Sequence, residues 1–166
     1  MAHDGMRIGW AQTDLTPAET CLVCGQFYAR LSERVMDPVT ATALAIDTGD
    51  DHAVLVSCDL VAIPDEFRES IRAHLGDGAA GLDPRKVLIS ATHTHTAPDV
   101  RMAGWSDGTT GTTLGVELKA MGGEGFQAFA APKIADAIRR AWAARAPGGV
   151  AFGQGYAVKI GRASCR

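Results

Sequence analysis

The chain has 166 residues, 46% of them apolar, which is enough for one globular domain or for part of a larger one. A formal net charge of −3 and the lack of any basic run argue against nucleic acid as a partner. We find neither a signal peptide nor an apolar run long enough for a transmembrane segment. The chain as written is therefore expected to be cytoplasmic, or secreted if its true N-terminus lies upstream.

The N-terminal part predicts two strands joined by a long loop. Residues 6–12 form the first strand, and residues 39–47 form the second. The second is small and β-branched on both alternating sides, so we expect both of its faces to be covered. The connecting residues 18–34 have no clean period. Either this loop lines a functional site, or its aromatic side chains, Phe27 and Tyr28, cover the core.

The four cysteines are too few and too scattered for a disulfide framework. Cys21 and Cys24 spell C-x-x-C, but no second pair follows and no strand–helix context surrounds them. We therefore expect two ordinary thiols in a loop, with a structural zinc or redox role as the alternative.

The middle of the chain predicts a strand, a helix and a second strand. Residues 53–58 are predicted to form an apolar strand, paired with residues 39–47 as a hairpin across a polar turn. Residues 65–75 form a helix, because apolar residues at four-residue spacing make one stripe along it. Residues 87–91 are again short, apolar and β-branched. A crossover of this length favours parallel pairing of the two strands that flank the helix.

The strand at residues 87–91 runs into Thr92-His93-Thr94-His95-Thr96. In an extended chain the side chains alternate, so His93 and His95 are predicted to point the same way from the strand end. Two imidazoles on one face can bind one divalent ion. Catalytic zinc needs three protein ligands, however, and a histidine at a strand end is also an ordinary polar residue.

Two carboxylates are candidates to act beside the histidines. Asp59 follows the strand at residues 53–58, at the carboxyl edge where ligand sites of α/β sheets gather. It is equally a common turn former. Asp99 lies close after the histidines in sequence, although the spacing does not guarantee that either carboxylate reaches an ion.

The C-terminal part predicts a Gly- and Thr-rich segment, a helix and a further strand. Residues 102–125 form either a lid over the site or a disordered stretch, and Trp105 either stacks on a substrate or anchors the loop. Residues 126–145 form an amphipathic helix, in which Pro132 marks the first turn or a kink. Residues 150–156 are predicted to begin another strand.

Three segments resemble the neutral/alkaline, non-lysosomal ceramidase family. VLISATHTHTAPDV (residues 87–100) is similar to the zinc-site segment that follows a buried strand in that family. Residues 8–17 and residues 53–60 are similar to its N-terminal strand and turn and to its second buried strand. The resemblance extends in this order over residues 8–156. The chain departs from the family at residues 96–99, where Thr-Ala-Pro-Asp replaces the commoner Ser-Gly-Pro-Gly, and this leaves the substrate open.

The resemblance implies a zinc-dependent amide hydrolase that cleaves the N-acyl bond of ceramide or a related lipid amide. It implies that His93 is a zinc ligand and that His95, beside the metal, contacts the substrate or orients the site. It also favours a catalytic role for Asp59. The family's other zinc ligands, a second His, a Glu and a Tyr, have no matching position in this chain.

The predicted fold class is α/β, with a mixed, largely buried sheet flanked by helices in an incomplete domain. Residues 159–166, KIGRASCR, match the translation of a sequencing-adapter read-through. We therefore expect residues 1–158 to be the N-terminal fragment of a ceramidase-like catalytic domain, inactive alone. The expected partner is a small-molecule lipid amide, which the protein would reach at a membrane surface.

Two other functions are compatible with the pattern. An amidohydrolase-type barrel also uses His-x-His at a strand end, but normally on its first strand, whereas here other strands precede it. A non-enzymatic α/β interaction module with a surface histidine pair should have a complete C-terminus, and the adapter-like tail counts against it.

Overall fold

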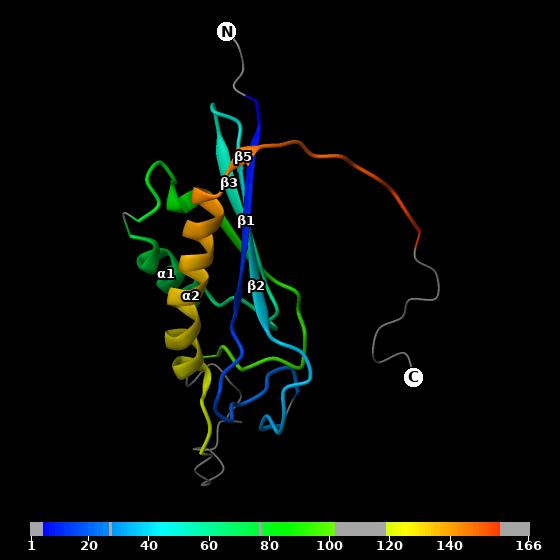
Figure 1. Cartoon of the computed structure of the whole chain (residues 1–166). Helices are drawn as coiled ribbons and strands as arrows, with labels where there is room; N and C mark the ends of the chain where they lie inside the picture. The colour runs from blue at the N-terminus through cyan, green and yellow to red at the C-terminus, as the bar shows by residue number, and fades with distance from the viewer. Residues whose placement is uncertain (1–4, 27, 77, 102–118, 157–166) are drawn as a thin grey trace.

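The computed structural model describes residues 5–26, 28–76, 78–101 and 119–156. These residues form a five-stranded sheet with the strand order β4-β3-β2-β1-β5 and two α-helices, which lie on the same side of the sheet (Figure 1). The strands are β1 (Arg7–Asp14), β2 (Thr40–Asp47), β3 (His52–Cys58), β4 (Val87–Ala91) and β5 (Ala146–Pro147). The helices are α1 (Asp65–Leu75), the short 3-10 helix η1 (Pro84–Lys86) and α2 (Gly123–Ala143).

The sheet is mixed, as predicted. β1, β2 and β3 are antiparallel neighbours, and β2 and β3 form the expected hairpin. β3 and β4 are parallel, with Val54 opposite Val87 and Cys58 opposite Ala91, and α1 is the crossover between them. The strand–helix–strand unit and the α/β fold class with a mixed sheet flanked by helices are therefore confirmed.

Helix α1 has the predicted bounds because its apolar stripe has a surface to pack on. Phe67, Ile71 and Leu75 are buried in the core. Full burial of each such side chain contributes about 1.5–3 kcal/mol. The helix ends at Gly76, whose φ of 48° lies in the left-handed region that glycine adopts without strain.

Helix α2 packs closely on the sheet because small residues meet at the contact. A Cβ on Gly9 of β1 would lie 2.2 Å from the carbonyl oxygen of Ala141, so only glycine fits there. The helix begins at Gly123, three residues earlier than predicted, and Pro132 lies inside it rather than in its first turn. No helix among the described residues is long and apolar enough to cross a bilayer.

Two sequence predictions are wrong in the described residues. Residues 150–156 do not form a strand. β5 lies earlier, at Ala146–Pro147, where it pairs with the start of β1. Phe152 and Tyr156 are 95% and 90% exposed, so this segment lacks the apolar contacts that would order a strand. The second wrong prediction concerns β2, of which only one face is buried.

Several predictions concern residues outside the described ranges and stay predictions. They are Phe27, the part of the segment predicted as a lid or a disordered stretch (residues 102–125) that covers residues 102–118 with Trp105, and the adapter-like residues 159–166. The last three residues of that segment, 123–125, belong instead to α2.

Candidate metal site

The two histidines lie just beyond the carboxyl end of β4, beside the segment that follows β3. The amide of Thr92 donates to the carbonyl oxygen of Cys58, and the amide of His93 donates to that of Leu60, each at 2.9 Å. His93 has φ 63°, and it is the one non-glycine residue with a positive φ in the described ranges. Strained backbone of this kind persists where surrounding contacts hold it, and it is common at functional sites.

The imidazoles of His93 and His95 come together, but not for the predicted reason. Strand β4 ends at Ala91, and the left-handed turn at His93 interrupts the alternation on which the prediction depended. The turn nevertheless brings the two Nε2 atoms to 3.4 Å, with the ring centroids 5.0 Å apart and the ring planes at 74°. Both side chains are exposed, so the pair is open to solvent.

The position of the His93 ring fixes its tautomer. Its Nδ1 lies 2.6 Å from the carbonyl oxygen of Val61. A carbonyl oxygen only accepts hydrogen bonds, so this contact requires the proton on Nδ1 and leaves Nε2 without a proton in the neutral ring. Metal-ligating histidines are usually held in this way by a carbonyl behind the ring.

The distance between the two histidines fits two ligands of one zinc ion. Zn–N bonds of about 2.0–2.1 Å at a tetrahedral angle place the two nitrogen atoms about 3.3–3.4 Å apart. The observed separation of the Nε2 atoms is 3.4 Å. In the part of the chain that the structure describes, no group of three His, Cys, Asp or Glu side chains could hold a metal ion. The pair therefore offers two of the three protein donors that catalytic zinc requires.

Asp59 follows β3 as predicted, but its carboxylate is engaged with β2. Its Oδ2 accepts hydrogen bonds from the backbone amide of Thr40 at 3.1 Å and from the Thr40 hydroxyl at 2.7 Å. Thr40 is the first residue of β2, which lies on the side of β3 away from β4. These contacts give the carboxylate a structural role between β2 and the end of β3, and the catalytic role of Asp59 stays a prediction.

Asp99 is buried behind the histidines and is held by Arg101. The guanidinium of Arg101 donates to both carboxylate oxygens, at 2.8 and 2.9 Å. Burial raises the pKa of Asp99, but the hydrogen bonds from Arg101 outweigh it, so that the pKa lies below its ordinary value. Asp99 is thus ionised at neutral pH and already paired.

The C-x-x-C cysteines are buried, free thiols in the loop between β1 and β2. Burial raises the pKa of the Cys24 thiol, and the nearby charge of Asp99 raises it further. A thiol with a raised pKa is a poor nucleophile and a poor metal ligand at neutral pH. The expectation of ordinary loop thiols is consistent with this environment.

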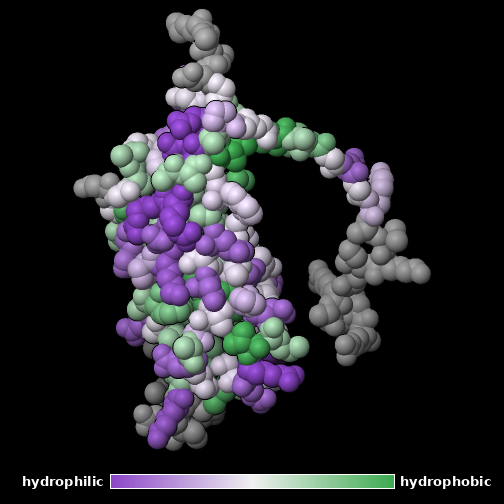
Figure 2. Space-filling view, viewed as in Figure 1, coloured by the Kyte–Doolittle hydropathy of each residue, from purple (hydrophilic) through white to green (hydrophobic). Residues whose placement is uncertain are grey.

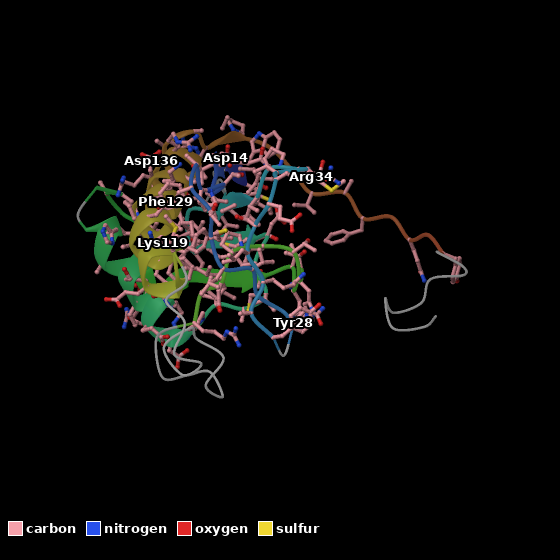
Figure 3. All side chains as sticks on the ribbon, turned by 90° about the horizontal axis from the view of Figure 1, so that it is seen from below. Asp14, Tyr28, Arg34, Lys119, Phe129 and Asp136 are labelled. Atoms are coloured by element: carbon pink, nitrogen blue, oxygen red, sulfur yellow. The ribbon has the colours of Figure 1, made fainter. Side chains whose placement is uncertain are left out.

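The loop between β1 and β2 packs against the histidine segment, as the first of the two interpretations of residues 18–34 requires, and its lining of a functional site stays a prediction. The amide of Cys24 donates to the carbonyl oxygen of Ala97 at 3.0 Å, and the amide of Asp99 donates to that of Leu22 at 2.8 Å. Tyr28 is 64% exposed and lies at the rim, on the side away from α2 (Figure 3). It does not cover the core.

Sequence reasoning missed two residues of this loop that contact His95. Arg30 donates to the carbonyl oxygen of His95, and Gly25 lies against the His95 side chain. No spacing rule connects residues so far apart in the sequence. The one available signal was a glycine in the middle of an irregular loop, which commonly marks a close approach of the backbone.

Comparison with known proteins supports the fold of this chain. No family model matches it, and no curated protein matches it in sequence. Among solved structures, a neutral ceramidase from Pseudomonas aeruginosa is similar, with a TM-score of 0.66 and 24% identity over 87% of this chain. A structure described as a ceramidase complexed with C2 is similar as well, with a TM-score of 0.59 and 22% identity over the same share.

These identities establish the fold alone, and at that level they confirm the resemblance seen in the sequence. The chain folds like part of a neutral ceramidase. It covers 22% of the length of each of the two solved chains.

Proposed function

We propose that this chain is the N-terminal part of a zinc-dependent amide hydrolase of the neutral ceramidase type, which cleaves the N-acyl bond of a ceramide or a related lipid amide. The observation that carries the proposal is the exposed imidazole pair, with its Nε2 atoms 3.4 Å apart at the carboxyl end of β4. The similarity of the fold to two ceramidase structures supports the choice of substrate class.

His93 is the proposed zinc ligand, and it would bind through Nε2. The carbonyl of Val61 holds the proton on Nδ1, and so leaves Nε2, the atom nearest to His95, without a proton and able to bind a metal. His95 either supplies a second nitrogen or contacts the substrate beside the metal. Zinc, when bound, lowers the pKa of a water ligand toward neutrality and polarises the amide carbonyl.

The remaining donors are expected from outside the described residues. Two imidazoles alone bind zinc weakly, and Asp99 is already paired with Arg101. We therefore propose that the chain by itself binds zinc with low affinity and does not turn over substrate.

The barrel alternative fits the fold poorly. A (β/α)8 barrel consists of parallel strands, and its His-x-His motif lies on the first of them. Here the motif follows β4, and the strands before it in the sequence are antiparallel to one another. The interaction-module alternative is an outcome of the experiment below.

Calorimetric titration with zinc and an assay with a fluorescent ceramide test the proposal together. We expect weak zinc binding that His93→Ala abolishes, and no turnover by the chain alone. His74→Ala is the matched control, because this imidazole lies on α1 and bonds to its own helix through the carbonyl of Ser70. Zinc binding that persists in His93→Ala would contradict the proposed ligand, and a wild-type chain that binds no zinc would favour an interaction module. Tight binding with turnover would show that the site is complete in this chain.

A further inference from the structure

One side chain connects the loop between β1 and β2 to the imidazole pair. The Nη2 atom of Arg30 donates to the carbonyl oxygens of Cys24, at 2.6 Å, and of His95, at 2.5 Å. Hydrogen bonds from a guanidinium are charge-assisted, and they are stronger than bonds between neutral groups. Arg30 thus ties the backbone of His95 to a loop that lies 65 residues earlier in the chain.

Gly25 makes the second contact, directly on the His95 side chain. Its φ of 100° lies in the left-handed region, which side chains rarely adopt. A Cβ at this position would lie 2.5 Å from both Cβ and Cγ of His95, well inside van der Waals contact. Backbone conformation and space therefore both require glycine where the loop meets the imidazole.

The loop that carries these two residues is itself held in place. The amide of Val23 donates to the carbonyl oxygen of Arg30 at 2.9 Å, and the amide of Cys24 donates to that of Ala97 at 3.0 Å. The strand-like segment around Val23 is thus bonded to Arg30 on one side and to the chain just after the histidines on the other. The loop residues that contact His95 are therefore themselves held by backbone hydrogen bonds.

The placement of Arg30 is costly, and no ion pair explains it. Its Nε atom is buried without a hydrogen-bond partner. Within the described ranges no carboxylate lies within ion-pair distance of its guanidinium. A buried donor without a partner calls for an explanation, and here the two carbonyl oxygens provide it, because they direct the guanidinium toward the peptide of His95.

We propose that Arg30 and Gly25 are positioning residues for His95, which hold its imidazole at 3.4 Å from Nε2 of His93. The consequence for metal binding rests on the proposed function. The geometric claim does not, because it concerns the distance between two rings in the metal-free chain.

Nuclear Overhauser effects between the ring protons of His93 and His95 test this claim in the metal-free chain of residues 1–166. Wild type should show the effect, since the ring centroids are 5.0 Å apart. Arg30→Met and Gly25→Ala should lose most of it, and Arg30→Lys should retain part, because a lysine can still donate to a carbonyl. The matched control is Arg85→Met, which removes an exposed arginine paired with Asp83 before β4.

Zinc titration and thermal unfolding of the same variants separate positioning from general stability. We expect Arg30→Met to weaken zinc binding by about tenfold, the lower end of the effect of residues that orient metal ligands. Arg85→Met should leave zinc affinity unchanged. If Arg30→Met does not fold, the ring contacts and zinc affinities of Arg30→Lys and Gly25→Ala, compared with those of wild type, test the proposal instead.

The outcomes distinguish this inference from the proposed function. Unchanged ring contacts in the folded variants would overturn the inference, even if their melting temperatures fell. Loss of the ring contacts in a chain that binds no zinc at all would support positioning, and it would contradict the proposed function instead.

Discussion

The two faces of the sheet differ in what covers them. On the face toward the helices, Ala43, Val54 and Val56 are buried in one core cluster with apolar side chains of α1 and α2. The outer sides of these helices are largely hydrophilic, as the purple residues over α2 in Figure 2 show. This half of the molecule therefore has the ordinary layering of a soluble α/β protein.

The opposite face carries an apolar row that the described residues leave open. The strand registers place Trp10 opposite Leu44, Leu44 opposite Leu55, and Leu55 opposite Leu88. Trp10, Leu55 and Leu88 are 72%, 43% and 57% exposed. Four large apolar side chains in one line across four strands form a patch of the kind that mediates association.

This difference separates the residues that stabilise the fold from those that are exposed and available for binding. The buried core lies on the helix-covered face, and we expect the open face to contribute mainly to association. The histidine segment differs from both, because backbone hydrogen bonds and Arg30 hold it rather than apolar burial. Substitutions in these three places should therefore have separable effects.

Phe67→Ala should have the largest effect on stability. The Phe67 side chain is completely buried in the core. Its truncation leaves a cavity and should reduce the free energy of unfolding by about 3–5 kcal/mol. Urea denaturation measures this, with Phe152→Ala as the control because Phe152 is 95% exposed. Equal effects of the two substitutions would contradict the assignment of the core.

Asp99→Asn should have the next largest effect, of about 1.5–3 kcal/mol, as expected for hydrogen bonds to a charged group. The side chain of Asp99 is 10% exposed and accepts hydrogen bonds from Arg101. Its pKa lies below the ordinary value of 3.8 in the folded chain, so its contribution is present above that pH. The contribution is lost as the pH falls through the folded pKa.

Urea denaturation between pH 7 and pH 2 checks this prediction. Wild type should lose stability below pH 4 more steeply than Asp99→Asn, in which this carboxylate can no longer titrate. Parallel curves for the two proteins would show that the pair with Arg101 adds nothing to stability.

Leu55→Lys should change stability least, by about 0.5 kcal/mol, because substitutions at exposed positions are usually tolerated. It should nevertheless reduce self-association, since it places a charge in the middle of the open apolar row. Sedimentation velocity over a range of concentrations measures this. A monomeric wild type would show that the open face does not drive association.

Local patterns predicted the elements that depend on short-range rules. The prediction of helix α1 was correct because Phe67, Ile71 and Leu75 repeat at four-residue spacing and are buried in the core. The parallel pairing of β3 and β4 followed from the length of the crossover. The strand predicted at residues 150–156 was wrong. β5 forms earlier because it pairs with the edge of β1, and the local pattern does not encode where that edge is available.

The sequence predicted which histidines belong to the candidate site, but it did not predict the backbone geometry that brings them together. The histidine pair was found from its spacing, yet the left-handed backbone of His93 brings the rings together. The contact of Asp59 with Thr40 and the contact of Arg30 with His95 join distant segments of the chain. Such contacts form only in the folded chain, and the periodicity of the local sequence does not predict them.

His93 is the proposed zinc ligand, and His95 either supplies a second nitrogen or contacts the substrate beside the metal. X-ray absorption at the zinc edge, on the chain of residues 1–166 loaded with one equivalent of zinc, tests this assignment most directly. We predict imidazole nitrogen at about 2.0–2.1 Å and no sulfur in the coordination shell. The imidazole signal should vanish in the His93→Ala, His95→Ala double variant. Sulfur at about 2.3 Å, as Cys21 and Cys24 would give, or an imidazole signal that survives the double substitution, would contradict the account.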